Sequence, residues 1–429
     1  MLLRVNSSVV RDDSGELTVV LHEERYAREL APAITALESA RDVTTNESLG
    51  AYLDAKIDEL RTGSKEAVWK SDLAWLNLSG DVDFVIGTAV ENYLDRLMGV
   101  RGNAQAVVCR VNDTYQGFCD DFIEMLPELE ERAPWHHKKV VDADNLPLLR
   151  FVDAITWSGG YDMFPATVAA ESLPNDQRFR ETEGSVNLVF ANVQEAIMDG
   201  GDKTYIRDEF IPRTEIERYG DELGYMGLIM TAVHEMGHAS GGVAIDVQPN
   251  DHFGTEYSRM EEARAELFSM WALPILTEKG VITPDQEVAG FYSMLVSMTG
   301  ALQNAPEDHS GSRNMMFHYF LETGALVETP EDGKVKYTVN PDVMRSSVED
   351  MLGLMGNIRA TGDKEALAEF KSEYLRTNQR EEFEERLKDR PDGRLLIFPE
   401  MEIQDGKYTG NVTYAEAFRD QPRTLNNFL

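Results

Sequence analysis

The hydrophobic and polar positions of this sequence repeat mostly with the 3.6-residue period of an α-helix. This pattern predicts helical segments over about 23–62, 114–132 and 222–380. Within the first segment, Asn46 and Gly63 are typical of positions where one helix begins and another ends. Helices are therefore expected to make up most of the chain.

Shorter apolar runs interrupt this pattern. Residues 82–99 and 103–113 are expected to be strands on either side of a glycine-containing turn. Asp-Gly pairs at 332–333 and 405–406 lie between strand-like runs and predict tight hairpins. Residues 157–179 hold two glycines and two prolines, and we expect an extended crossing between two lobes there. The elements together predict a mostly helical α+β protein.

Composition places the chain among globular proteins and suggests its compartment. Its 429 residues are 42% hydrophobic and 27% charged, which is enough to build one large domain or two lobes. No segment reaches the roughly 18 apolar residues of a membrane span, and the first residues do not resemble a signal peptide. Cys109 and Cys119 are too few for a disulfide framework. We therefore expect a cytoplasmic protein.

The charge narrows the range of partners. A formal net charge of -35 opposes binding to nucleic acid and to anionic membrane surfaces, so neither is expected as a partner. An acidic surface with little lysine is also typical of proteins from a high-salt cytoplasm, which we hold as a hypothesis about origin. A stability maximum at low ionic strength would contradict it.

The sequence "HEMGH", residues 234–238, carries the clearest chemistry. On a helix His234 and His238 share one face, so both rings can reach one metal ion. Two neutral imidazoles form part of the tetrahedral shell of Zn²⁺. Glu235 projects beside them, where a carboxylate can take a proton from a water without binding the metal. The motif therefore predicts a hydrolytic zinc centre.

Such a centre needs a third protein ligand, and a second helical stretch, "SRMEEARAEL", offers candidates. Glu262 and Glu266 share a face of that helix, and Glu261 is turned about 100° away. His252 in the intervening loop is a further candidate. Spacing alone leaves all four open.

"HEMGH" followed by "EEARAE" resembles the zinc signature of the dipeptidyl peptidase III family. The resemblance implies that Glu262 is the third zinc ligand and that Glu261 orients a ligating histidine. Many members carry a histidine motif one residue longer, whereas this chain has the five-residue form that some bacterial members share. The resemblance implies a zinc-dependent peptidase that acts on short peptides.

Further stretches resemble the family's substrate-binding motifs, in the family's order. "VENYLD" implies that Glu91 holds the free amino group of the peptide and that Tyr93 stabilises the transition state. "SLPND" resembles the family's Asn-Ile-Pro-Asn and implies the same amino-end role for Asn175, which matches the second asparagine, whereas Ser172 replaces the first.

"DHSGSR" keeps the family's His-x-x-x-Arg spacing and implies transition-state and substrate-binding roles for His309 and Arg313. "EGSVNLVFANVQEA", between these motifs, continues the match, which covers most of the chain from about residue 70.

The resemblance also implies a two-lobed, zincin-like fold in which the zinc site of a helical lobe faces a cleft. We expect a smaller mixed α/β lobe from 1–113, about 160–200 and 396–429, and a helical zinc-binding lobe from about 114–159 and 201–395. This chain is much shorter than typical members, chiefly before the tyrosine motif and between the zinc motifs.

The expected function is therefore hydrolysis of short peptides with release of dipeptides from the N-terminus. One alternative is a zinc aminopeptidase or oligopeptidase with a different cut point. Another is a non-catalytic zinc-binding or peptide-binding protein, which would have no use for Glu235.

Overall fold

The computed structural model describes residues 5–95, 99–139, 148–159, 170–198, 201–238, 240–304, 306, 308–390, 397–405 and 407–416. The chain forms two compact units. The sheet unit comprises residues 1–116, 148–193 and 394–429, and the helical unit comprises residues 117–147 and 194–393.

The sheet unit begins with a hairpin and a group of helices: β1 (Ser7–Arg11), β2 (Leu17–Leu21), α1 (His22–Arg25), α2 (Ala27–Val43), α3 (Glu47–Thr62) and α4 (Lys65–Leu76). The Asn46 side chain accepts a hydrogen bond from Leu49 N at the start of α3. Gly63 ends α3 in the left-handed region, at φ 54°. Both turn signals are therefore confirmed.

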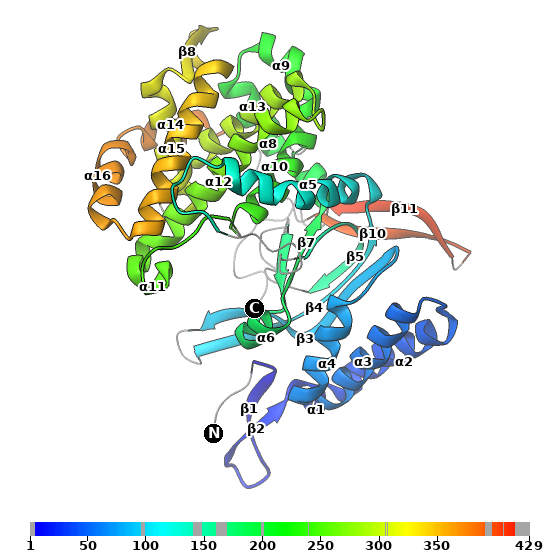
Figure 1. Ribbon diagram of the computed structural model, residues 1–429. Helices are drawn as coiled ribbons and strands as arrows, with labels where there is room; N and C mark the ends of the chain where they lie inside the picture. Colours follow the sequence, from blue (N-terminus) through cyan, green and yellow to red (C-terminus); the bar gives the residue numbers. More distant parts are fainter. Residues whose placement is uncertain are drawn as a thin grey trace. The chain divides into compact units, whose positions relative to one another are not determined.

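Its centre is a five-stranded sheet in the order β3-β4-β5-β7-β6 (Figure 1). The strands are β3 (Val82–Asp95), β4 (Gly99–Val111), β5 (Leu148–Gly159), β6 (Ala170–Leu173) and β7 (Val186–Phe190), and α6 (Gln177–Thr182) connects the last two. All pairs are antiparallel except β5 with β7. A hairpin of β10 (Ile397–Gln404) and β11 (Lys407–Glu416) packs beside β5.

Two expectations about this region are wrong. Residues 148–159 were expected in the helical lobe, but they form β5, which pairs with β4 and β7 inside the sheet. Residues 157–179 were expected to cross between lobes, but their described ends lie in one sheet, in β5 and β6. Residues 160–169 lie outside the described part.

The helical unit contains most of α5 (Asp113–Arg132) and α7 (Ala191–Met198), which both begin in the sheet unit. Its remaining elements are α8 (Gly201–Phe210), α9 (Arg213–Tyr219), η2 (Gly220–Glu222), α10 (Leu223–His238), α11 (Pro249–Phe253), η3 (Gly254–Glu256), α12 (Tyr257–Glu278), α13 (Pro284–Ala301), α14 (Asp308–Thr323), β8 (Leu326–Glu331), β9 (Lys334–Val339), α15 (Pro341–Thr361), α16 (Lys364–Tyr374) and α17 (Arg380–Arg386).

Both predicted Asp-Gly hairpins are present. Asp332 and Gly333 have φ values of 52° and 77°, as a type I′ turn requires, and Asp405 has φ 52° in the turn between β10 and β11. The mostly helical α+β class is therefore confirmed.

Helix α12 forms the core of the helical unit and packs against α10, α13, α14 and α15 (Figure 1). The helix is buried on almost every face. Accordingly, residues 267–276, which follow the charged first turns, are apolar on all sides apart from Ser269. Among the described residues, no helix combines the length and the apolar character that crossing a bilayer requires. The chemistry of the unit lies where α10 and α12 touch.

Candidate metal centre

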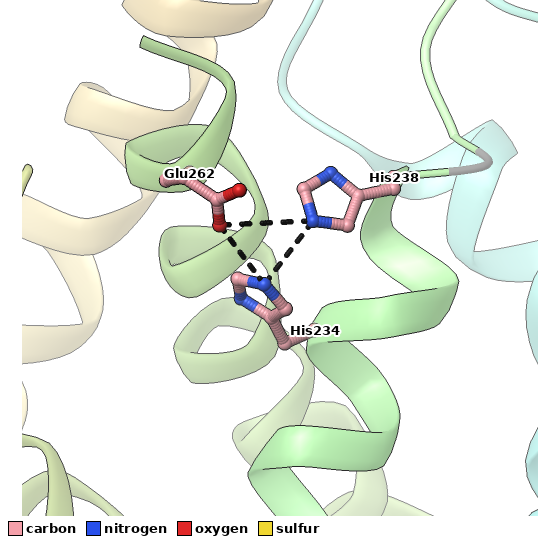
Figure 2. A group of neighbouring side chains, drawn as sticks. All are labelled: His234, His238 and Glu262. Carbon is pink, nitrogen blue, oxygen red and sulfur yellow. Dashed lines mark hydrogen bonds and ion pairs between the residues drawn. The ribbon is translucent and has the colours of Figure 1, made fainter. Parts of the chain in front are cut away.

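Helices α10 and α12 bring His234, His238 and Glu262 together (Figure 2). The two histidine Nε2 atoms are 3.1 Å apart. Glu262 Oε2 lies 3.2 Å from His234 Nε2 and 3.8 Å from His238 Nε2. Among the described residues, these three form the one cluster whose ligand atoms suit a metal ion.

The close approach of the two helices depends on Gly237, which stands between the ligating turns. A Cβ on Gly237 would lie 3.1 Å from Phe268 Cδ1 and 3.4 Å from Ala265 Cα. The lack of a side chain here lets the backbones of α10 and α12 approach, with Phe268 and Ala265 of α12 facing Gly237. Glu262, three residues before Ala265, lies on the same face of α12 and points towards the histidines.

The three residues fit a divalent cation. Ligands placed about 2.0–2.1 Å from a tetrahedral Zn²⁺ lie roughly 3.3 Å from one another, and the distances here are 3.1, 3.2 and 3.8 Å. Glu262 Oε2 is buried, yet none of the described residues completes a hydrogen bond to it. A cation would satisfy this oxygen and the lone pairs of two imidazoles that face each other.

Glu261 supports the centre from behind. His238 Nδ1 donates to Glu261 Oε1 over 3.0 Å, which leaves His238 Nε2 with a lone pair for a metal. Arg264 donates to both carboxylate oxygens of Glu261, and Arg359 Nε lies 3.0 Å from Oε2. Burial would raise the pKa of Glu261, but these partners, with Arg264 foremost, lower that pKa below its usual range. Burial opposes a charge on His238 too, but Glu261 outweighs it and raises the pKa of this ring.

The two other candidates for the third ligand are engaged elsewhere. Glu266 accepts hydrogen bonds from Arg313 Nε at 2.8 Å and from Ser312 Oγ at 3.2 Å. His252 donates from Nε2 to the carbonyl of Gly362 over 2.8 Å. Neither belongs to the metal-binding cluster.

Helix α14 adds His309 and Arg313 to the rim of the centre. His309 Nδ1 lies 3.3 Å from Glu262 Oε2 and 3.7 Å from Glu266 Oε1. The nearby carboxylate of Glu266 raises the pKa of His309, against the effect of burial. About half of the His309 side chain is exposed (52%), so the ring can reach a bound molecule.

Glu235 follows His234 on α10 and is half-buried. Its carboxylate has no hydrogen bond or ion pair to any residue that the structure describes. A carboxylate without such ties is available to exchange protons with a water beside the cation.

The residues expected to bind the amino end of the substrate, Glu91 and Asn175, lie in the sheet unit with Tyr93. Glu91 and Tyr93 are in β3, paired with Asn103 and Arg101 of β4, and their side chains lie outside the described part. Asn175 Nδ2 donates to the carbonyl of Val90 over 3.1 Å, which places it beside the backbone that leads into Glu91.

Arg264, Arg359 and the role of Glu266 as a partner of Arg313 are not among the features predicted from the sequence. Arg264 had a readable signal, because it stands three residues after Glu261 on one helix. Arg359 is far away in sequence and reaches Glu261 only through the packing of α15 on α12.

Comparison with known proteins assigns the chain to a family. The sequence profile of peptidase family M49 matches residues 5–252, a stretch that includes "HEMGH". The chain is 26% identical over 376 residues to Nudix hydrolase 3 of Arabidopsis thaliana, covering 85% of this chain and 46% of that protein. It is 28% identical over 169 residues to human dipeptidyl peptidase 3, covering 39% of this chain and 22% of the relative. The chain thus spans less than half the length of these relatives.

Solved structures confirm the expected fold. The dipeptidyl peptidase III structure from Caldithrix abyssi matches with a TM-score of 0.78 and 23% identity, covering 90% of this chain and 73% of that one. The structure from Corallococcus sp. strain EGB matches with a TM-score of 0.66 and 21% identity, covering 90% and 71%. With a profile match over more than half of its residues and the fold of dipeptidyl peptidase III, this chain belongs to peptidase family M49.

Proposed function

We propose that this protein is a zinc-dependent peptidase that releases dipeptides from the N-terminus of short peptides. The observation that carries the proposal is the cluster of His234, His238 and Glu262 with the untied carboxylate of Glu235 beside it. The name of human dipeptidyl peptidase 3 supports the type of product.

The ligand set favours zinc as the metal. Two imidazoles and one carboxylate are the protein ligands of many hydrolytic zinc sites, and three ligands leave a coordination position open. When bound, zinc would lower the pKa of a coordinated water and polarise the carbonyl of the scissile peptide bond.

Each residue around the centre then has its own role in the reaction. Glu235 takes a proton from the attacking water and later delivers it to the nitrogen of the leaving amine. His309 on α14, at the rim of the centre, donates a hydrogen bond to the oxygen that becomes negative in the transition state. For Tyr93, the transition-state role rests on the resemblance of its motif to that of the family. Glu261 keeps His238 in one tautomer and one orientation.

The peptide is held at its ends by charged and polar groups. Glu91 pairs with the free ammonium group, and Asn175 contributes its amide beside it. Arg313, whose Nε is fixed by Glu266, offers its remaining N–H groups to the peptide backbone or carboxylate.

One observation favours a different cut point as the second candidate. Ser172 stands where the family has an asparagine, and its hydroxyl accepts a hydrogen bond from Arg180 Nη2 over 3.0 Å. A weakened amino-end clamp would give an aminopeptidase or oligopeptidase instead. Mass spectrometry of products from a free and an N-blocked peptide separates these candidates. The free peptide yields dipeptides from a dipeptidyl peptidase and single amino acids from an aminopeptidase, and only an oligopeptidase cleaves the blocked one.

The variant Glu235→Gln tests the central role. It keeps size and hydrogen bonding but cannot accept a proton, so we expect kcat to fall by about 10²–10⁴-fold. Zinc content, measured by elemental analysis, should stay at the wild-type level. Glu217→Gln, an exposed change on α9, is the control and should leave kcat unchanged. Full turnover by Glu235→Gln would contradict its role as the base.

The cytoplasm is the compartment that we propose. Both cysteines are free and buried in a chain that carries no other, which suits a reducing environment. Recovery of the native protein in a secreted fraction would contradict this location.

A further inference from the structure

Helix α15 ends beside the connection between the two metal-binding helices. Three hydrogen bonds join its last turn and C-terminal cap to residues 240–256, which we name the metal-helix connection. They run from Arg359 Nη1 to the Gly241 carbonyl (3.2 Å), from Ala244 N to the Ala360 carbonyl (2.8 Å) and from His252 Nε2 to the Gly362 carbonyl (2.8 Å).

Arg359 is the point where this end of α15 meets the metal centre. Its Nε lies 3.0 Å from Glu261 Oε2, in a pair whose side chains are only 12% and 8% exposed. The same guanidinium therefore contacts the carboxylate that orients His238 and the connection that follows His238 in the chain. No other described side chain makes a hydrogen bond or ion pair to both.

Arg264 and Arg359 contribute differently to the position of Glu261. Arg264 lies on the same helix as Glu261 and also donates to the Gly237 carbonyl, so it is part of the α10–α12 contact itself. Arg359 arrives from a third helix and approaches the carboxylate at Oε2. Arg264 and His238 tie the carboxylate to α12 and α10, whereas Arg359 adds a tie to a third helix, α15.

We propose that Arg359 is a positioning residue of the metal centre, which holds Glu261 against His238 and anchors the metal-helix connection. Its function is to set how tightly the centre binds a divalent cation and how slowly the cation leaves. The proposal rests on the metal centre of the proposed function. Outer partners of ligating histidines commonly change metal affinity by about 10–100-fold, so the effect is measurable.

Helix α15 offers a matched control. Arg345 lies near the other end of the same helix and also pairs with a buried carboxylate, with its Nε 2.7 Å from Glu287 Oε1. Arg345→Ala therefore removes the same chemical group and a comparable ion pair, but none of its contacts involves the metal-binding residues.

The experiment measures the dissociation constant and the release rate of zinc by competition with a chromogenic chelator. We expect Arg359→Ala to bind zinc about 10–100-fold more weakly and to release it faster. Arg359→Lys, which keeps the charge but not the planar fork, should recover part of the affinity. Arg345→Ala should stay within twofold of wild type. Should Arg359→Ala not fold, Arg359→Gln takes its place in the same comparison.

The outcomes separate this inference from the proposed function. A wild-type protein that binds no zinc overturns the metal centre and this inference with it. If the wild type binds zinc and Arg359→Ala or Arg359→Gln binds it within twofold as tightly, only the positioning role is overturned. Equal weakening by Arg345→Ala also overturns it, because the loss would then reflect the general stability of α15.

Discussion

The two sides of the metal centre differ in how their polar groups are satisfied. Behind His238, Glu261 and Arg264 are buried (8% and 0% exposed) and bonded to each other and to the backbone. In front of Glu262, His309 is half exposed and Glu235 has no bond to any described residue. One side can hold a cation in place, while the other can contact a substrate. Substitutions on the side of Glu261 and Arg264 should therefore alter stability and metal affinity. Substitutions on the side of His309 and Glu235 should alter turnover.

The largest effect is expected from Arg264→Met, behind the centre. Removing one partner of a buried ion pair leaves the other charge uncompensated, which costs about 3–5 kcal/mol in the free energy of unfolding. Urea denaturation of the metal-free protein measures this loss. Arg218→Met on α9, which breaks an exposed pair with Asp285 of α13, should leave the free energy of unfolding almost unchanged. A loss for Arg264→Met as small as that of this control would mean that Glu261 does not depend on Arg264.

A smaller effect, and of a different kind, is expected from His309→Ala in front of the centre. Removing one hydrogen-bond donor to the transition state lowers kcat by about 10²-fold, which corresponds to about 2.7 kcal/mol. Since the ring touches Glu262 only at its rim, zinc affinity should change less than about threefold. Peptide hydrolysis and chelator competition measure the two quantities.

His136→Ala, at an exposed histidine of the helical unit, is the matched control for this variant and should change neither quantity. If His309→Ala lost zinc as readily as it lost activity, the front of the centre would have a metal-holding role, and the division into two sides would be wrong.

The contact between α10 and α12 also shows which features of the centre the sequence could predict and which it could not. "HEMGH" and "EEARAE" were readable because helical spacing alone places His234 and His238 on one face. The choice among Glu261, Glu262 and Glu266 was open from spacing, because it depends on the rotation of α12. The face of α12 that meets α10, with Phe268 and Ala265 beside Gly237, is set by contacts between the helices that no local pattern reveals.

Contacts between residues far apart in the sequence could not be predicted for the same reason. Arg359 reaches Glu261 only because α15 packs on α12, and nothing near Arg359 in the sequence indicates this contact. Residues 148–159 follow a helix and were assigned with it, but their pairing partners in β4 and β7 decide their unit. Local signals such as Asn46 and Asp332-Gly333 succeeded because capping and turn geometry involve only neighbours.

The smallest effect is expected from Gly241→Ala, which strains the back of the centre without removing a polar group. Gly241 has φ 83°, and an added Cβ would lie 3.6 Å from Arg359 Nη1, an ordinary contact, so only the backbone conformation opposes alanine. We expect a loss of about 1–2 kcal/mol in the free energy of unfolding and zinc binding within about threefold of wild type. Gly324→Ala, at φ 79° with open space around it, carries the same strain far from the ligands and should match this loss of stability. A larger loss of zinc from Gly241→Ala than from Gly324→Ala would mean that the backbone of the metal-helix connection, as well as the Arg359 side chain, determines how firmly His238 is held.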